Sequence, residues 1–204
     1  MKKYAFGVDI GGKIGFFYTN GTLLDKWEIK TNTENNGESI LSDVAKAVDN
    51  KLAQEAISKD DVQGIGIGVP GPVDSQGVVH RCVNLGWGVV NVAEELGNLT
   101  GLTIKVGNDA NVAALGEMWQ GGAKGSKDVI MVALGTGVGG GIIVDGKVVA
   151  GFNGAGGEIG HITVNHDEIE ACNCGQYGCL EQYTSATGIV RLAKRKLAKS
   201  SEET

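Results

Sequence analysis

The stretch YAFGVDIGGKIGFFYTNGTLLDKWEI, residues 4–29, decides the fold class of this 204-residue chain. Its apolar runs are separated by two short turns, Gly11-Gly12 and Asn20-Gly21. Asn-Gly favours a hairpin because both central residues of a type I′ turn need a positive φ. The stretch therefore predicts three antiparallel strands, over residues 4–10, 14–19 and 23–29.

A series of helices and strands is predicted after this meander. Apolar residues spaced three and four apart predict a helix over about residues 39–57. Residues 62–69 predict a buried strand whose alternate glycines, at 64, 66 and 68, face a closely approaching helix. Later segments predict helices at 92–96 and 110–119, a strand at 103–106, and hairpin strands at 129–134, 140–144 and 147–150. This order predicts a mixed α/β sheet.

Composition narrows the function classes. The net charge of −6, from 18 basic and 24 acidic residues, disfavours nucleic-acid binding through phosphate neutralisation. Glycine accounts for 34 residues and proline for only 2, which is typical of tight loops in a folded chain. No apolar run approaches the length of a membrane span, and the N-terminal stretch has no signal-peptide core. We therefore expect a cytoplasmic protein with no membrane partner.

One histidine and three crowded cysteines form the strongest local motif: His161, Cys172, Cys174 and Cys179. One imidazole and three thiolates complete a tetrahedral site with no open position, so we expect a structural Zn²⁺ ion. Free thiols or a redox pair are the alternative. The remaining cysteine, Cys82, stands alone. If zinc folds this loop, the nearby Glu158 and Glu181 are drawn towards one site as acceptors for sugar-type hydroxyls.

Glycine-bearing turns at residues 9–13, 68–72 and 134–141 are candidate phosphate sites. Glycine lets backbone N–H groups converge on an anion without a Cβ in the way, although a plain hairpin turn is the alternative for each. No Walker-type P-loop motif is present. Asn108-Asp109 lies between a predicted strand and helix, where catalytic groups of open α/β sheets gather. A carboxylate there suits a general base, and a helix N-cap is the alternative.

Six motifs extend, in order, over nearly the whole chain from Tyr4 to about Gly188. They are GIGVPGPVD at 66–74, NLGW at 84–87, GNDANVAA at 107–114, LGTGVGGG at 134–141, GGEIGH at 156–161 and CNCGQYGCLE at 172–181. Together they resemble the ROK family (repressors, open reading frames and sugar kinases), and within it the bacterial ATP-dependent glucokinases. The resemblance implies an α/β actin-like ATPase fold, with two ribonuclease-H-like lobes around a cleft.

The resemblance also implies a role for each motif residue. Asp109 would be the catalytic base that takes the proton from the sugar 6-hydroxyl, and His161 would contact both the zinc and the sugar. The other implied sugar contacts are Gly71, Asn84, Asn108, Glu158 and Glu181. ATP with Mg²⁺ would be held by Asp9, Gly11, Gly12, Lys13, Thr136 and Gly137. Because phosphoryl transfer depends on positioning and charge neutralisation, we expect a kinase acting on glucose or a related hexose.

Two departures from the family pattern affect these expectations. The first loop lacks the threonine that follows its two glycines in the family, which leaves Gly11-Gly12 as a two-residue turn. The chain is also shorter than the family kinases, so we expect an N-terminal lobe over 1–116 and, over 117–204, the start of a truncated C-terminal lobe carrying the zinc loop. The alternatives are a truncated, non-catalytic sugar-binding chain and a sugar-responsive regulator. The regulator is less favoured, because the regulators of the family carry a DNA-binding segment before the first strand, and here that strand begins at Tyr4. We also expect a homo-oligomer, in the simplest case a dimer.

Overall fold

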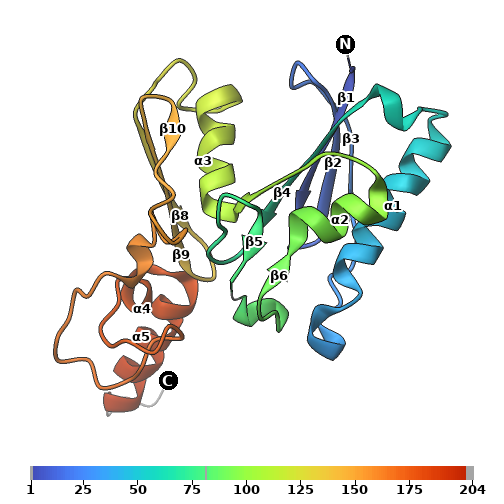
Figure 1. Ribbon diagram of the computed structural model, residues 1–204. Coiled ribbons are helices and arrows are strands. Elements are labelled where there is room, and N and C mark those ends of the chain that lie inside the picture. Colours follow the sequence, from blue (N-terminus) through green and yellow to red (C-terminus); the bar gives the residue numbers. More distant parts are fainter. Residues whose placement is uncertain (1, 81, 201–204) are drawn as a thin grey trace. The chain divides into compact units, whose positions relative to one another are not determined.

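The computed structural model describes residues 2–80 and 82–200, and the chain divides into two compact units (Figure 1). Unit 1 consists of Met1–Val112 and Gly151–Ala155, and unit 2 of Ala113–Ala150 and Gly156–Thr204. The last residues of the predicted second lobe, 201–204, lie outside the described residues. Within the described ranges, no helix has the length and apolar character needed to cross a membrane.

Unit 1 is built on a five-stranded mixed sheet with the strand order β3-β2-β1-β4-β7. Its strands are β1 (Tyr4–Asp9), β2 (Lys13–Tyr18), β3 (Leu23–Glu28), β4 (Val62–Val69) and β7 (Ile104–Asn108). The first three pair antiparallel, which confirms the predicted meander. β1 pairs parallel with β4, and β4 parallel with β7, so the C-terminal ends of all three strands reach the same sheet edge.

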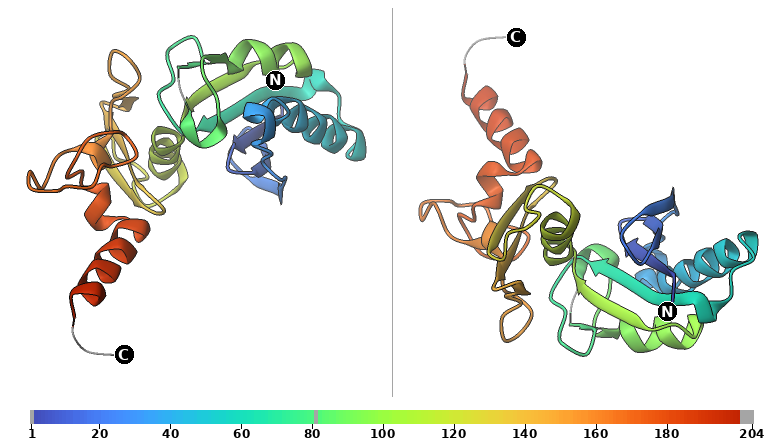
Figure 2. Two further views of the ribbon diagram at one scale, coloured as in Figure 1. Left: turned by 90° about the horizontal axis from the view of Figure 1, so that it is seen from below. Right: turned by 90° about the horizontal axis from the view of Figure 1, so that it is seen from above.

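Two helices, α1 (Ile40–Gln54) and α2 (Val92–Thr100), lie side by side against one face of this sheet (Figure 1 and Figure 2). The apolar faces of the two helices pack against strand residues such as Ile14 and Ile67. Val44, Val48 and Leu96 on these faces are fully buried. Burial of these side chains, at about 25 cal/mol per Å² of apolar area, is the main stabilisation of the unit. Short elements complete it: η1 (Glu34–Gly37), η2 (Lys59–Asp61), β5 (Val78–Val79), η3 (Val83–Leu85) and β6 (Val90–Asn91).

The prediction that a helix covers the glycine side of β4 is wrong for most of the strand. The helices pack on the side of Ile65 and Ile67 instead, because these side chains supply the apolar surface. A Cβ at Gly64 would overlap the Thr103 carbonyl oxygen, so the close neighbour there is the chain entering β7. Only at Gly68 does a helix approach, through the Cα of Asp109 at 3.5 Å from the position of a Cβ.

The first turn differs from the predicted two-residue hairpin. Asp9 pairs with Lys13, so three residues make the turn and Gly11-Gly12 is only part of it. The third is Ile10, which is 1% exposed. Its N–H donates to the Gly68 carbonyl at 3.1 Å. Because burial of Ile10 in the core ties that residue to β4, β1 stops pairing with β2 one residue earlier than expected.

Unit 2 contains a separate three-stranded antiparallel sheet with the order β10-β9-β8. Its strands are β8 (Val129–Leu134), β9 (Val138–Val144) and β10 (Lys147–Val148), which confirms the predicted hairpins. The helices around it are η4 (Ile159–His161), α4 (Glu181–Thr184) and α5 (Ala186–Lys199). A further helix, α3 (Asp109–Gln120), begins in unit 1 and ends in unit 2.

Candidate active site

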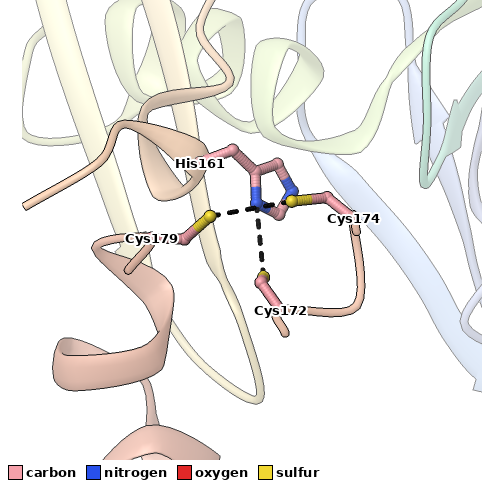
Figure 3. Close-up of side chains that lie close together, drawn as sticks. All are labelled: His161, Cys172, Cys174 and Cys179. Atoms are coloured by element: carbon pink, nitrogen blue, oxygen red, sulfur yellow. Dashed lines mark hydrogen bonds between the residues drawn. The ribbon is translucent and has the colours of Figure 1, made fainter. Parts of the chain in front are cut away.

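The predicted zinc ligands converge in unit 2 (Figure 3). The ligand atoms of His161, Cys172, Cys174 and Cys179 all lie within 4.8 Å of one another. The Sγ atoms of Cys174 and Cys179 are 3.6 Å apart, and Cys172 Sγ is 3.8 Å from His161 Nδ1. Two sulfur ligands of a tetrahedral zinc, each bound at about 2.3 Å, lie about 3.8 Å apart. The cluster therefore has the spacing of a Cys₃His zinc site.

The chemistry of the donor set also fits a cation. Burial raises the pKa of Cys179 to about 12, and the neighbouring sulfurs of Cys174 and Cys172 add to the rise. Burial likewise raises the pKa of Cys172. A zinc ion supplies the positive charge that keeps such thiols deprotonated, because thiolates are its ligands. Without a cation Cys172 and Cys179 are therefore neutral thiols, and a bound Zn²⁺ ion would supply the charge that turns them into thiolate ligands.

Local turns bring the ligands together. The N–H of Cys172 donates to the Gln176 carbonyl at 2.7 Å, and the N–H of Gly175 donates back to the Cys172 carbonyl at 2.8 Å, which closes a tight loop that carries the first two cysteines. Gly178 has a φ of +71°, and a Cβ there would overlap the carbonyl oxygen of Asn165. Only glycine fits this position, so the CGxxGC spacing is a requirement of the loop geometry.

His161 uses its two ring nitrogens differently. Nδ1 faces the sulfurs, and Nε2 lies 3.9 Å from Oε2 of Glu158, the N-cap residue of η4. With Nδ1 on a metal, the remaining proton is fixed on Nε2. The structure thus places two predicted sugar contacts, His161 Nε2 and Glu158, next to each other, one as a donor and one as an acceptor.

Glu181, the third predicted sugar contact of unit 2, begins α4 directly after the zinc loop. Its Oε2 accepts a hydrogen bond from the N–H of Val138 at 2.9 Å, and its Oε1 lies 3.8 Å from Cys172 Sγ. The carboxylate therefore joins the zinc loop to the glycine loop, residues 134–141, whose Thr136 and Gly137 are predicted phosphate contacts.

In unit 1, Asp109 lies where β7 ends and α3 begins. The protein around its carboxyl disfavours the charged form and raises the pKa of Asp109, and the negative charge of Asp9 adds to the rise. A hydrogen bond from the N–H of Ala110 at 2.8 Å opposes it. A carboxylate with a raised pKa is a better proton acceptor than an ordinary aspartate, as a general base requires.

Asn108 contacts another predicted sugar residue. Its Nδ2 donates to the carbonyl oxygen of Gly71 at 3.3 Å, so the loop after β4 and the end of β7 are tied together. Its Oδ1 accepts from the N–H of Asn111 at 3.1 Å, which is the bond of a helix N-cap. The N-cap alternative therefore holds for Asn108, and the cap leaves the neighbouring Asp109 at the open end of the helix.

The loop that carries Asn84 is held from two sides. Asn84 lies in η3, between the bridged residues Cys82 and Trp87. The indole N–H of Trp87 donates to the Gly37 carbonyl at 3.3 Å in a buried setting. Burial raises the pKa of Cys82, and the charge of Asp109 adds to it, so the loop lies within electrostatic reach of Asp109. Asn84 itself is exposed and available to a ligand.

The two predicted phosphate loops differ in their free donors. In the first loop, the N–H of Gly11 donates to Asp9 Oδ1 and the N–H of Gly12 to the Asp9 carbonyl, both at 2.9 Å. Lys13 opens β2 and is exposed. In the second loop, the N–H groups of Thr136 and Gly137 have no hydrogen-bond partner among residues 2–80 and 82–200. The second loop is therefore the better anion site.

Comparison with known proteins identifies the family of the chain. The model of the ROK family matches residues 5–204. The chain belongs to the ROK family. A glucokinase of Halalkalibacterium halodurans is 45% identical over 204 residues, which cover 98% of this chain and 62% of the relative. A ROK family glucokinase from Streptomyces griseus, crystallised with glucose and AMPPNP, matches with a TM-score of 0.80 at 36% identity, over 97% of this chain and 62% of that one.

The match to this ROK glucokinase structure confirms the actin-like ATPase fold that the family resemblance implied. The family also includes regulators: a putative xylose repressor of a Caldicellulosiruptor species is 32% identical over 192 residues, 92% of this chain and 48% of the repressor. The chain spans less than two thirds of the length of each of these three relatives.

Sequence reasoning missed α5 and the residues that link it to the rest of unit 2. Thr187 donates to the Thr136 carbonyl at 2.7 Å, and Arg195 forms a two-pronged pair with Glu168. Ser185 accepts from the N–H of Gly188 as the N-cap of α5, a signal visible in the sequence. The contacts themselves join residues up to 51 positions apart, and no local pattern encodes them.

Proposed function

We propose that the protein is an ATP-dependent glucokinase, which transfers the γ-phosphoryl group of ATP to the 6-hydroxyl of glucose. The observation that carries the proposal is Asp109: a carboxylate with a raised pKa at the open N-terminal end of α3, in a chain that belongs to the ROK family and matches glucokinases. Kinases of this type need little covalent chemistry from the protein beyond a well-placed proton acceptor.

Asp109 acts as the general base in this proposal. As the 6-oxygen of glucose forms its bond to the γ-phosphorus, its O–H bond breaks and the proton passes to the Asp109 carboxylate. The bond between the γ-phosphorus and the bridging oxygen to the β-phosphate breaks, and ADP leaves with the electron pair. Asp109 then returns its proton to solvent. Proton transfer of this kind contributes about 10² to 10⁴ in rate.

The other predicted residues bind and orient the substrates. Each unit carries its own proposed sugar contacts: Asn108, Gly71 and Asn84 in unit 1, and Glu158, His161 and Glu181 in unit 2. A donor on His161 Nε2 beside an acceptor on Glu158 suits a pair of adjacent hydroxyls, each of which donates and accepts.

The nucleotide and the metals have separate sites in the proposal. The proposed phosphate contacts are the N–H groups of Thr136 and Gly137 in unit 2, and Gly11, Gly12 and Lys13 in unit 1. Asp9 faces the Mg²⁺ ion, which when bound neutralises charge on the phosphates. The structural Zn²⁺ is held by His161 and the three cysteines of the cluster in unit 2.

We also propose the domain organisation and the cellular setting of the protein. The two compact units support an N-terminal lobe near residues 1–116 and the beginning of a C-terminal lobe in 117–204. The protein is cytoplasmic, forms a homodimer, binds no nucleic acid and supplies glucose 6-phosphate to carbohydrate metabolism through glycolysis.

A coupled assay for glucose 6-phosphate, with the full-length protein, ATP and Mg²⁺, tests the function. The expected turnover is on the order of 1 to 100 per second with glucose, and lower with fructose, mannose or an N-acetylated hexose. Glucose binding without phosphoryl transfer would favour a sugar-binding protein or a regulator, as the match to a xylose repressor allows. Faster turnover with another hexose would correct the substrate while leaving the reaction in place.

A further inference from the structure

The start of α5 and the start of α4 hold the glycine loop through three hydrogen bonds, all within unit 2. The N–H of Ala186 donates to the Gly135 carbonyl at 2.9 Å, and the hydroxyl of Thr187 donates to the Thr136 carbonyl at 2.7 Å. The carboxylate of Glu181 accepts from the N–H of Val138 at 2.9 Å. We call these three residues, Glu181, Ala186 and Thr187, the loop clamp.

The loop clamp fixes the direction of two peptide planes. In a trans peptide, the C=O of one residue and the N–H of the next point to opposite sides. Because the Gly135 carbonyl points to Ala186, the N–H of Thr136 points away from α5. Because the Thr136 carbonyl points to Thr187, the N–H of Gly137 also points away from α5. The clamp therefore aims two consecutive N–H groups away from the helix.

The same arrangement keeps carbonyl oxygens away from the anion. The carbonyls of Gly135 and Thr136 are occupied by α5, and that of Gly137 accepts from the N–H of Gly135 at 3.0 Å. The N–H groups of Thr136 and Gly137 have no partner in the part of the chain that the structure describes. A Cβ at Gly137 would overlap the Glu181 carboxylate, so the loop and the clamp fit closely only with glycine there. Two convergent amide donors without competing acceptors form an anion-binding nest.

We propose that Thr187 is a positioning residue for the phosphate-binding glycine loop, which it aims by holding the Thr136 carbonyl. This inference rests on the proposed function, because it takes ATP phosphates as the anion. Thr187 does not touch the nucleotide. It acts through the peptide between Thr136 and Gly137. The neighbouring Ser185 is fully buried and caps α5, and its hydroxyl lies 3.1 Å from that of Thr187.

The test uses three variants of the full-length, zinc-loaded protein. Thr187→Val keeps the shape of the side chain and removes the hydroxyl that donates to Thr136. Thr187→Ser keeps the hydroxyl. Thr184→Val is the matched control, because it also removes a threonine hydroxyl near the start of α5, but one that donates only to the Leu180 carbonyl within its own helical turn, at 3.0 Å. Affinities for AMPPNP with Mg²⁺ and for glucose are measured separately by calorimetry.

Thr187→Val is expected to weaken AMPPNP binding by about 5- to 10-fold, the effect of one lost hydrogen bond, and to change glucose binding by less than about twofold. Thr187→Ser and Thr184→Val are expected to bind both ligands within about twofold of the wild type. Hydrogen exchange in residues 134–138 should also become faster in Thr187→Val and remain slow in the other two variants.

Equal AMPPNP affinity in Thr187→Val and the wild type would overturn the positioning role. Equal losses for AMPPNP and glucose would also overturn it, because they would show general loosening of unit 2. The failure of the proposed function has a different signature: a wild-type protein that binds AMPPNP but phosphorylates no sugar. In that case, the ratio of AMPPNP affinities between Thr187→Val and the wild type still tests the role of Thr187. A wild type that binds no AMPPNP would overturn both.

Discussion

The carboxylate of Glu181 accepts a hydrogen bond from the N–H of Val138 at 2.9 Å. This bond connects the end of the zinc loop to the first residue of β9. Val138 is 6% exposed, so water cannot readily replace this acceptor. Glu181, which the family resemblance assigns to sugar binding, thus also stabilises the fold of unit 2. The Cys₃His cluster, the predicted sugar contact Glu181 and the glycine loop are parts of one hydrogen-bonded network within unit 2.

Removing the Glu181 side chain should therefore destabilise the protein. We expect Glu181→Ala to lower the free energy of unfolding by about 1–3 kcal/mol, because the buried N–H of Val138 loses its acceptor. Glu181→Gln keeps an oxygen acceptor and should cost less than half as much. Glu117→Ala is the control: Glu117 accepts the N–H of Gly122 at 2.8 Å in an exposed setting, where water can replace it. Urea denaturation measures all three, and equal effects for Glu181→Ala and Glu117→Ala would contradict the argument.

The sequence predicted the elements that depend on local patterns. The meander of residues 4–29 and the strand Val62–Val69 follow from apolar alternation and turn residues, and the structure confirms both. The Cys₃His cluster also follows from the sequence, because the Gly178 position admits only glycine and the cysteine spacing then closes the loop.

The unpredicted features depend on contacts between distant segments. Nothing local shows that Ile10 is buried against β4 and lengthens the first turn to three residues. Likewise, the glycines of β4 indicate a close approach, but not that the neighbour at Gly64 is the Thr103 carbonyl. The hydrogen bond from Thr187 to Thr136 is of the same kind. Tertiary packing decides such details, and periodicity does not report it.

The zinc cluster gives a direct prediction. Protein purified without chelators should contain about one zinc ion per chain, because four ligands close a tetrahedral site. Cys179→Ser should lose the metal, whereas Cys82→Ala should keep it, since Cys82 lies outside the cluster and in unit 1. Elemental analysis measures the zinc content of both variants.

Removal of the metal should weaken glucose binding before global unfolding, because the loop bearing Glu158 and Glu181 loosens. A metal-free wild type with normal glucose affinity would contradict this.

Asp109 gives a prediction for catalysis. Asp109→Asn should lower kcat by at least about 10² and leave the KM for glucose nearly unchanged, because only the proton acceptor is lost. Coupled assays on the full-length protein measure both constants. Near-normal turnover would show that Asp109 is only the first residue of α3.

The titration of Asp109 gives a separate test of its surroundings. The surrounding protein, which displaces water from the carboxyl, and the charge of Asp9 raise the pKa of Asp109, so its carboxylate should be protonated at a higher pH than an ordinary aspartate near 3.9. Asp9→Asn removes one of the two causes and should move the Asp109 titration, followed by carboxyl NMR, to lower pH. Asp60→Asn, at an exposed site in η2, serves as the control and should leave it unmoved. A shift to higher pH in Asp9→Asn would contradict the assignment.

Glu168 provides the last prediction, for stability against pH. Its side chain is 2% exposed and accepts hydrogen bonds from Arg195, Arg191 and the Tyr183 hydroxyl, which ties the zinc-loop segment to α5. The Arg195 guanidinium, followed by the N–H of Glu170, Tyr183 and Arg191, holds the pKa of Glu168 well below its ordinary value, against the effect of burial.

Because the folded-state pKa is lowered, the stabilisation by Glu168 is fully present above its unfolded pKa of about 4.3 and is lost as the pH falls below that value. Glu168→Gln should therefore lower the free energy of unfolding by about 2–4 kcal/mol at pH 7, and by progressively less as the pH falls below about 4. Glu170→Gln, at a half-exposed partner of the same arginines, should cost much less, because solvent screens exposed ion pairs. Denaturation of both variants at pH 7 and pH 3.5 measures the difference, and an equal penalty for Glu168→Gln at the two pH values would mean that packing, and not charge, makes Glu168 stabilising.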